Sequence, residues 1–491
     1  MHTLEVDVAI IGAGTAGMSA YRAALHHTRS VVVIEGGPYG TTCARVGCMP
    51  SKLLIAAAEA AHAVAHADRF GVIAQPPQID GAAVMQRVRD ERDRFVGFVT
   101  EAVEQWPAEH RLRGHARFID EHTLQIDDHT LVQASRIVIA TGSHANVPAA
   151  WRAAAGDRLI INDDVFAWTT LPESVAVLGA GVIALELAQA LHRLGVRVQV
   201  YARGERVGPL TDPALQALTH EVMGHELPLM LNAGEVTLRR VGDGGSGNGS
   251  DGRGAAVIVQ ALRDGVSDAQ RFDWVLAASG RSPNVLALGL QNTQLPLDPH
   301  GVPVFDARTG QIGNSPVFIA GDVNAELELL HEAADEGRIA GDNAGRFPDI
   351  RLRPRRAPLA VAFTDPQLMI AGQSHRQLRA SGVAFEVGEV SFVDQGRSRV
   401  IGKNQGALRV YAEHNSGRFL GAEMIGPAAE HLGHLLAWSA QRGDTVQQML
   451  DSPFYHPVIE EGLRTALRHL QRALRMGPVP VERCLDCGPG A

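Results

Sequence analysis

The sequence has few aromatic residues and no excess of positive charge. Phe, Trp and Tyr make up 5% of its 491 residues, and the formal net charge is −9 at pH 7. Proteins that bind nucleic acids or anionic membranes usually present a basic patch, and stacking on bases also needs aromatic side chains. We therefore expect neither nucleic acid nor a membrane as a partner. The expected ligand is a small molecule.

Long apolar runs are also absent from the sequence. The longest apolar region, Leu53 to Ala65, is interrupted by Glu59 and His62, whereas a membrane-spanning helix needs about 20 apolar residues. The first strand-like run begins at Val6 without the basic and apolar regions of a signal peptide. These features predict a cytoplasmic protein, in which thiols stay reduced.

Only four cysteines are present, and they form two close pairs, Cys43/Cys48 and Cys484/Cys487. In a reducing compartment, close pairs are typical of redox or metal chemistry, although ordinary core cysteines are the alternative. A regular helix would hold the Cα atoms of the first pair roughly 8.6 Å apart, and a disulfide needs about 7 Å or less. We therefore predict a distorted turn near Gly47.

Two stretches of the sequence have a strand, a glycine-rich turn, a helix and a second strand in succession. The first begins with EVDVAII (5–11), and the second occupies residues 174–200. This succession indicates a βαβ unit with parallel strands. After Pro354, strand-like segments alternate and are followed by helices, which indicates a separate α+β domain. The predicted fold class is α/β, with two Rossmann-like dinucleotide-binding domains and a C-terminal α+β domain.

The first glycine-rich turn contains Gly12, Gly14 and Gly17. Glycines at this spacing allow a tight turn, close approach of the backbone to a pyrophosphate and packing of the helix on the strand. An acid about 20 residues later binds ribose hydroxyls in such units, and Glu35 ends the next strand. A glycine turn before an ordinary helix is the alternative, but the combination favours a nucleotide such as FAD.

The second turn contains Gly179 and Gly181, with Ala184 at the third position. No acid precedes Glu205 at the end of the next strand, and Arg203 lies where a ribose 2′-phosphate would need a cation. Arg203 could also be an ordinary charged loop residue. The contrast between the two units predicts that the second prefers NADP(H) to NAD(H).

A histidine near the C-terminus has an acid five residues after it, His456 and Glu461 in YHPVIEEG. Exchange between a dithiol and a disulfide needs a base for the thiol proton and a carboxylate that orients the base. A lone histidine is more often structural. It becomes a catalytic candidate here because the cysteine pair is present in the same chain.

Taken together, these motifs resemble the class I pyridine nucleotide–disulfide oxidoreductases, the family of dihydrolipoamide dehydrogenase, glutathione reductase and mercuric reductase. The resemblance covers about residues 5–475. It is carried by GAGTAG, CARVGCMPSK, ATGS, GAGVIALE, GRSPN, AGDV, HEAADEG and HPVIEE. It implies a homodimer in which the disulfide of one subunit meets the histidine of the other, so the C-terminal domain is expected to be a dimerisation domain.

The resemblance also implies a role for each matching residue. Cys43 is the exchange thiol, and Cys48 lies against the flavin as the charge-transfer thiolate. Lys52 is the lysine near the flavin, and Glu186 lies beside it. His456 and Glu461 form the acid–base pair. Further positions expected to contact the cofactors are Asp322, on the FAD ribityl chain, and Ala116, Thr141, Gly142, His331 and Gly280.

The expected domain order follows from the two nucleotide units. An FAD-binding domain is broken by the NAD(P)-binding domain and then completed, and a flexible glycine-rich loop is expected at residues 242–254. The predicted boundaries are 1–150 and 283–350 for the FAD-binding domain, 151–282 for the NAD(P)-binding domain, 356–475 for the dimerisation domain and 476–491 for a flexible tail.

Two features depart from the family pattern. Arg45 stands where relatives usually carry Asn, and we expect its charge to favour a thiolate in the pair. The tail holds Cys484 and Cys487 in a CxxC, which is either a relay, a clip for a soft metal ion or incidental. Mercuric reductase differs from this chain because it has no imidazole at the place of His456. No resident metal site is predicted.

The sequence is therefore compatible with three functions. The first is a dihydrolipoamide dehydrogenase-like enzyme acting on a small-molecule or protein-borne disulfide. The second is an NADPH-dependent reductase of another disulfide or of thiol-bound Hg(II). The third is a non-catalytic flavoprotein subunit, against which the cysteine pair and the His456–Glu461 pair argue, since binding alone needs none of them.

Overall fold

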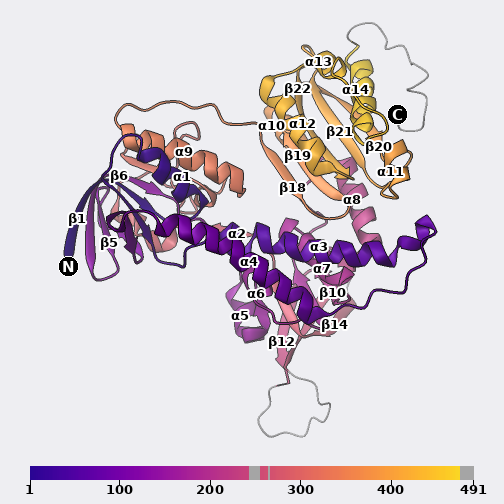
Figure 1. Cartoon of the computed structure of the whole chain (residues 1–491), viewed down its shortest axis with the longest axis horizontal. Coiled ribbons are helices and arrows are strands. Elements are labelled where there is room, and N and C mark those ends of the chain that lie inside the picture. The colour runs from indigo at the N-terminus through magenta and orange to yellow at the C-terminus, as the bar shows by residue number, and fades with distance from the viewer. Residues whose placement is uncertain (243–254, 264–265, 476–491) are drawn as a thin grey trace.

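The computed structural model describes residues 1–242, 255–263 and 266–475, and it contains three main sheets (Figure 1). The sheet of the first nucleotide unit lies on the left of the view, the second at the bottom and the C-terminal sheet at the upper right. Most of the loop predicted at 242–254, and the whole tail with Cys484 and Cys487, lie outside the described residues.

The first sheet has seven strands in the order β3-β2-β1-β6-β5-β4, with β17 paired to β6. Strands β1, β2, β3, β6 and β17 are parallel, and β4 and β5 form an antiparallel extension. Strand β17 comes from the segment that follows the second sheet, so the chain returns to the first sheet after completing the second. The strands are β1 (His2–Ile11), β2 (Val31–Glu35), β3 (Arg111–Arg113), β4 (Ala116–Phe118), β5 (Thr123–Ile126), β6 (Thr130–Ile139) and β17 (Val317–Ile319).

The second sheet is parallel, in the order β11-β10-β9-β15-β8, and a three-stranded antiparallel sheet, β12-β13-β14, accompanies it. All residues of β9 (SVAVL) are buried, as expected for a central parallel strand covered on both faces. The strands are β8 (Leu159–Ile160), β9 (Ser174–Leu178), β10 (Arg197–Tyr201), β11 (Leu229–Met230), β12 (Val236–Val241), β13 (Ala256–Arg263), β14 (Val266–Phe272) and β15 (Trp274–Ala277).

The C-terminal sheet is antiparallel, in the order β18-β19-β22-β21-β20. Two of its strands, β18 and β19, were not anticipated from the sequence. The chain crosses between the first two sheets twice, and the two crossings pair with each other as β7 and β16. The strands are β7 (Ser143–Ala145), β16 (Arg281–Pro283), β18 (Leu359–Ala362), β19 (Gln367–Gly372), β20 (Phe385–Ser391), β21 (Ala407–Glu413) and β22 (Phe419–Gly426).

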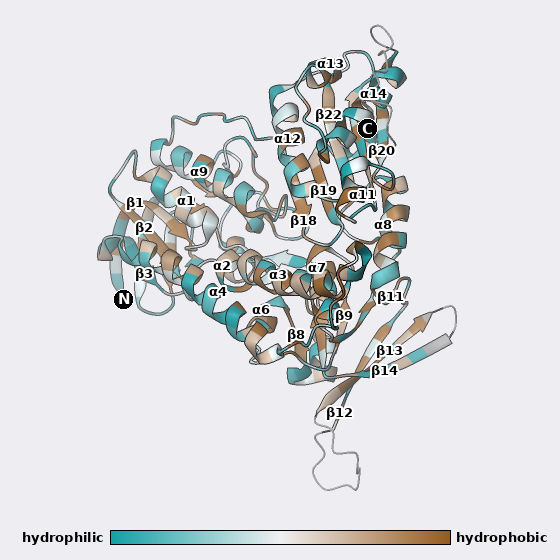
Figure 2. Cartoon of the chain, turned by 45° about the vertical axis from the view of Figure 1, so that its right-hand side comes forward, coloured by the Kyte–Doolittle hydropathy of each residue, from teal (hydrophilic) through white to brown (hydrophobic). Residues whose placement is uncertain are grey.

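Helices cover the faces of all three sheets, and Figure 2 shows their hydrophilic sides turned outward, most clearly along α4. The helices are α1 (Thr15–Ala24), α2 (Thr42–Val46), α3 (Cys48–Ala65), α4 (Gly81–Glu104), α5 (Ala149–Ala155), α6 (Asn162–Val165), α7 (Val182–Arg193), α8 (Pro213–Glu226), α9 (Leu330–Arg346), α10 (His375–Ser381), α11 (Gly396–Val400), α12 (Ala429–Arg442), α13 (Val446–Leu450) and α14 (Glu460–Leu474).

One hydrophobic core joins the second sheet to its neighbours. It includes Leu54 of α3 and Val177 of β9, together with Leu368 and Ile425 from the C-terminal sheet. Burial of this shared apolar surface makes separation of the two sheets unfavourable. The predicted α/β fold class is confirmed, and no helix among the described residues is long and apolar enough to cross a membrane.

Helices α1 and α9 pack with their backbones in contact, side by side on one face of the first sheet (Figure 1). A Cβ atom at Gly337 would lie 2.1 Å from the Ala16 carbonyl oxygen, and one at Gly341 would lie 2.2 Å from that of Ala20. Since α1 begins at the first glycine-rich turn, this packing fixes the position of that turn.

The close packing predicts that Gly341→Ala destabilises the protein. The added methyl group must push α9 away from α1, and overpacking of this kind costs about 1–3 kcal/mol. Gly97→Ala in α4 is the matched control, because no atom lies within 4 Å of its added Cβ and alanine is the better helix former. Thermal unfolding should show a lower midpoint for Gly341→Ala only. A midpoint at or above that of the wild type would contradict the packing.

Candidate functional site

The two cysteines lie on either side of a helix break. Helix α2 ends at Val46 and α3 begins at Cys48, while Gly47 has φ −126° and ψ −117°, outside the helical region. The distortion predicted at Gly47 is therefore present. The Asn162 Nδ2 of α6 donates to the Val46 carbonyl oxygen at 2.9 Å, so the second domain also holds the end of α2.

Both cysteines are free thiols, and their protons are unequally held. The pKa of Cys48 is lowered to about 7 because the Cys43 thiol donates a hydrogen bond to its sulfur, and the charge of Lys52 adds to this effect against burial. The same hydrogen bond, together with burial, raises the pKa of Cys43. Near neutral pH, Cys48 is therefore the cysteine that ionises, while Cys43 keeps its proton.

The cation beside the pair is Lys52, whereas the sequence had suggested Arg45. Burial raises the pKa of Asp163, and the charges of Arg281 and Arg45 oppose that rise, so the charge of Arg45 acts on Asp163. Lys52 is held in turn by Glu186 of α7, with Nζ 2.8 Å from Oε2. The other oxygen of Glu186 accepts a hydrogen bond from the backbone N–H of Phe363 at 2.8 Å.

The first glycine-rich turn has the shape that a bound dinucleotide needs. Gly12 has φ +105°, and a Cβ there would lie 2.4 Å from the Ala140 carbonyl oxygen. A Cβ at Gly17 would overlap the Gly12 carbonyl oxygen. A Cβ at Gly14, in contrast, would have no atom within 4 Å. The space in front of the N-terminus of α1 is thus open to a pyrophosphate. Glu35 ends β2, and its Oε2 accepts from the Ala13 N–H at 2.8 Å.

The Asp322 turn follows β17 in the same sheet. Asp322 Oδ2 accepts a hydrogen bond from Ser143 Oγ at 3.0 Å. The buried Glu336 of α9 shapes this turn, since its Oε2 accepts from Gly321 N–H and from Asn324 Nδ2, each at 2.7 Å. A role for Glu336 was not predicted from the sequence, although the HEAADEG motif contains this residue.

Other predicted cofactor residues lie around these turns. Thr141 Oγ1 donates to the Asn284 carbonyl oxygen at 2.9 Å, and the Gly142 carbonyl oxygen accepts from Asn284 N–H at 2.9 Å. Ala116 is buried in β4. The side chain of His331, in the first turn of α9, is 50% exposed. The roles predicted for these residues stay predictions.

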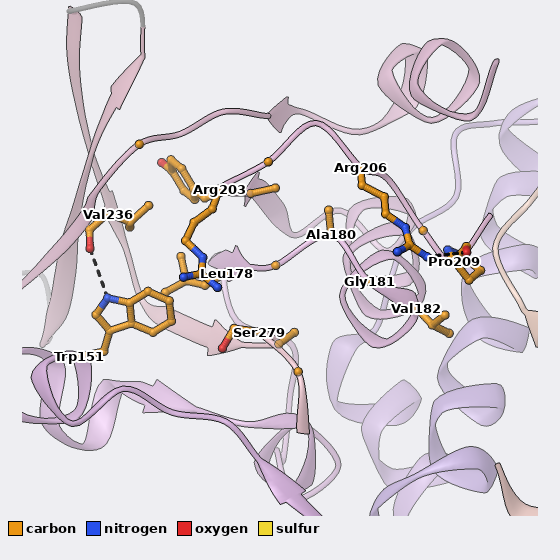
Figure 3. A pocket seen from close by; sticks show the side chains of 18 of the residues that line it. Trp151, Leu178, Ala180, Gly181, Val182, Arg203, Arg206, Pro209, Val236 and Ser279 are labelled. Carbon is orange, nitrogen blue, oxygen red and sulfur yellow. Dashed lines mark hydrogen bonds between the residues drawn. The ribbon is translucent and has the colours of Figure 1, made fainter. Parts of the chain in front are cut away.

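A cavity of about 670 Å³ lies against the second glycine-rich turn (Figure 3). Gly179 and Gly181 line it from the turn, and Gly280 lines it from the crossing between sheets. Arg203 points into the cavity and makes no hydrogen bond or ion pair within the described part of the chain, whereas Arg206 donates to the Pro209 carbonyl oxygen at 2.6 Å. The cavity also contains Trp151 and one acid, Glu235, neither of which was anticipated.

His456 and Glu461 form a hydrogen-bonded pair. The His456 Nδ1 lies 3.0 Å and 3.1 Å from the two carboxylate oxygens of Glu461. The carboxylate is 5% exposed and also accepts from Val458 N–H, while the imidazole is 74% exposed. The acid therefore holds one ring nitrogen, and the other edge of the imidazole is accessible.

The cysteine pair and the His456–Glu461 pair are not brought together within one chain. Helix α2 lies among the nucleotide domains, and α14, which begins at Glu460, lies at the far end of the C-terminal domain (Figures 1 and 2). Within residues 1–242, 255–263 and 266–475, no three His, Cys, Asp or Glu side chains are grouped to hold a metal ion.

The lowered pKa of Cys48 predicts how the reactivity of this thiol depends on pH. In the reduced protein, alkylation of Cys48 should rise with a midpoint near pH 7, because the lowered pKa populates the thiolate there. Cys43→Ala removes the donor and should move the midpoint upward, as should Lys52→Met, while the distant Lys403→Met should not. Mass spectrometry of the Cys48 peptide gives the profile. An unchanged midpoint in Cys43→Ala would refute the hydrogen bond.

Two sequence models of known protein families match this chain, one over the nucleotide domains and one over the C-terminal domain. The sequence model described as "Pyridine nucleotide-disulphide oxidoreductase" matches residues 6–337, and that of the dimerisation domain of the same proteins matches residues 359–467. Among curated proteins, the dihydrolipoyl dehydrogenase of Pseudomonas aeruginosa is 30% identical, covering 96% of this chain and 99% of its own. The mercuric reductase of Shigella flexneri is 29% identical, covering 96% and 82%.

Solved structures show the same fold. LpdA from Mycobacterium tuberculosis superposes with a TM-score of 0.78 at 23% identity, covering 95% of this chain and 100% of its own. The flavoprotein disulfide reductase RclA from Escherichia coli gives 0.75 at 23% identity, covering 94% and 99%. Since the first family model alone spans more than half of the 491 residues, the chain belongs to the pyridine nucleotide–disulphide oxidoreductase family of FAD-dependent enzymes.

Proposed function

We propose that this protein is an FAD-dependent NADPH:disulfide oxidoreductase of the dihydrolipoamide dehydrogenase type. Electrons would pass between NADP(H), FAD, the Cys43–Cys48 pair and a small-molecule or protein-borne dithiol/disulfide. The proposal is carried by the Cys43/Cys48 pair at the helix break, where the pKa of Cys48 is lowered and Lys52, held by Glu186, supplies a nearby cation. A structural cysteine pair needs neither a lowered pKa nor a neighbouring cation.

The residues around the first turn fit FAD. The open space at Gly14 and the cramped positions of Gly12 and Gly17 suit a pyrophosphate, and Glu35 and Asp322 lie at strand ends for the ribose and ribityl groups. When bound, FAD supplies a two-electron carrier between the nicotinamide and the cysteine pair. Lys52, held by the buried Glu186, adds a fixed positive charge at the Cys48 side.

The thiol chemistry follows from where the proton lies. His456 accepts the Cys43 proton, and the Cys43 thiolate attacks the substrate disulfide, forming a mixed disulfide and releasing one thiolate. That thiolate takes the proton from His456. The Cys48 thiolate then attacks the Cys43 sulfur, which closes the Cys43–Cys48 disulfide and releases the second thiolate. Glu461 holds the Nδ1–H, so the other ring nitrogen, Nε2, carries the lone pair that accepts the proton.

We also propose that the site is shared between two subunits. The dimerisation-domain match covers residues 359–467, which include His456 and Glu461. Within one chain these residues lie far from α2 (Figure 1). An accessible imidazole on this domain could therefore meet a cysteine pair across a dimer interface, as the partner subunit's His456 facing Cys43.

A second candidate is reduction of Hg(II) held by the thiols. The mercuric reductases from Shigella flexneri and Acidithiobacillus ferrooxidans, each 29% identical, favour it as much as the dehydrogenases favour the first. A thiolate–thiol pair also suits a soft metal ion. Steady-state rates with lipoamide, glutathione disulfide and Hg(II) separate the two. Turnover of Hg(II) alone would replace the first proposal with the second.

If His456 is the base, its removal should slow the reaction with the disulfide but not the reduction of the protein by NADPH. His456→Ala should lower disulfide turnover by roughly two to four orders of magnitude, while NADPH should reduce the oxidised protein at the wild-type rate, because that step does not involve the thiol proton. Stopped-flow absorbance gives the second rate. His431→Ala, an exposed histidine on α12, is the control. Equal losses in both half-reactions would make His456 structural.

The cavity predicts a preference for the phosphorylated nucleotide. A charge-assisted contact contributes about 1.5–3 kcal/mol, so Arg203→Ala should weaken NADPH roughly tenfold to a hundredfold and leave NADH unchanged. The ratio of kcat/KM for the two nucleotides measures this. Preference of the wild type for NADH would show that Arg203 is only a surface residue.

A further inference from the structure

The buried carboxylate of Glu423 joins the C-terminal sheet to the nucleotide domain. Glu423 lies in β22 and is 0% exposed. Its Oε2 accepts hydrogen bonds from the backbone N–H groups of Thr211 (2.5 Å) and Asp212 (3.0 Å), and its Oε1 accepts from Thr211 Oγ1 (2.5 Å) and His375 N–H (2.8 Å). A buried charge is tolerated only when its oxygens are satisfied, and four donors satisfy these.

A second buried acid faces Glu423 from the other side of the contact. Asp212 is 0% exposed and caps α8 by accepting from Ala214 N–H at 3.0 Å. It also accepts from Arg409 Nη1 at 2.5 Å and from the Tyr411 hydroxyl at 3.0 Å, both on β21. Each domain therefore places a carboxylate among hydrogen-bond donors of the other domain. These bonds fix how the two domains fit together.

The segment held in this way, residues 206–212, forms a wall of the nucleotide cavity. Arg206, Gly208 and Pro209 line the cavity. At one end, the Gly208 N–H donates to the Ala180 carbonyl oxygen of the glycine-rich turn at 2.8 Å. At the other end, Thr211 is fixed by Glu423. Gly208 is only three residues from Thr211, the residue that Glu423 holds. We therefore expect a displacement of Thr211 to move the cavity wall.

The charge of Glu423 also acts on the cavity wall. Burial and the charge of Arg376 lower the pKa of Arg206, and the charge of Glu423 opposes that fall. Arg206 places a cation among the residues that line the cavity (Figure 3).

We infer that Glu423 is a positioning residue for the pyridine nucleotide, acting from the dimerisation domain through residues 206–212. The inference rests on the proposed function, in which the cavity binds NADPH. Nucleotide affinity then depends on a side chain that does not line the cavity, and on the fit between two domains that share one core. A wall held from the C-terminal domain is also tied to the domain that carries His456.

The test compares Glu423→Gln with wild type in the FAD-loaded protein. Gln keeps the size of the side chain but replaces one acceptor oxygen with an NH₂ group, which leaves two donors unsatisfied. The dissociation constant for NADPH, measured by quenching of tryptophan fluorescence, should rise about tenfold. The kcat at saturating NADPH and the KM for the disulfide should stay within about twofold.

Two further variants keep the test decisive. Thr211→Val removes only the hydroxyl donor and should weaken NADPH by a smaller factor, about threefold. It replaces Glu423→Gln if that variant does not fold. Glu413→Gln, at the half-buried end of β21, is the control and should bind NADPH like wild type.

The outcomes separate the inference from the proposed function. If the variants lower the thermal midpoint while the NADPH dissociation constant stays at the wild-type value, Glu423 is structural and the inference is wrong. If wild type itself does not bind NADPH or NADH, the proposed function fails first. Weaker NADPH binding with unchanged kcat in Glu423→Gln, but not in Glu413→Gln, supports the inference.

Discussion

The hydrogen bond from the Cys43 thiol to the Cys48 sulfur is the interaction on which the chemistry depends. It lowers the pKa of Cys48 to about 7 and raises the pKa of Cys43, so the two thiols differ in acidity before any substrate arrives. The bond requires the chain to break its helix at Gly47. The charge of Lys52 adds to the effect of this bond and opposes burial, which favours the neutral thiol.

Much of the remaining structure holds the surroundings of this pair in place. Lys52 depends on Glu186, which is 134 residues away in the sequence and belongs to the second nucleotide unit. Glu186 also accepts from Phe363, at the edge of the C-terminal sheet. The charge beside the thiols is thus fixed by three parts of the chain at once. The same arrangement recurs at Glu423, where the C-terminal sheet holds the wall of the nucleotide cavity.

The parts of the site that follow from local spacing could be predicted from the sequence. Gly12, Gly14, Gly17 and Glu35 belong to one βαβ unit, and His456 is five residues from Glu461, so pattern and spacing suffice for both. The residues that were missed act through tertiary contacts. Glu336 and Glu423 are acids within a helix and a strand, and only the fold shows which N–H groups they accept from. Strands β18 and β19 were missed because each is short and follows a proline-rich or polar segment.

The central claim is that one active site takes its cysteines and its histidine from different subunits, and mixed dimers test it most directly. Cys43→Ser and His456→Ala chains are each expected to be inactive as homodimers. In a mixed dimer, one site loses both groups and the other retains both. Random mixing in equal amounts should therefore restore about a quarter of the wild-type disulfide reductase activity. If the mixed dimers stay as inactive as their parents, Cys43 and His456 act within one chain and the account is wrong.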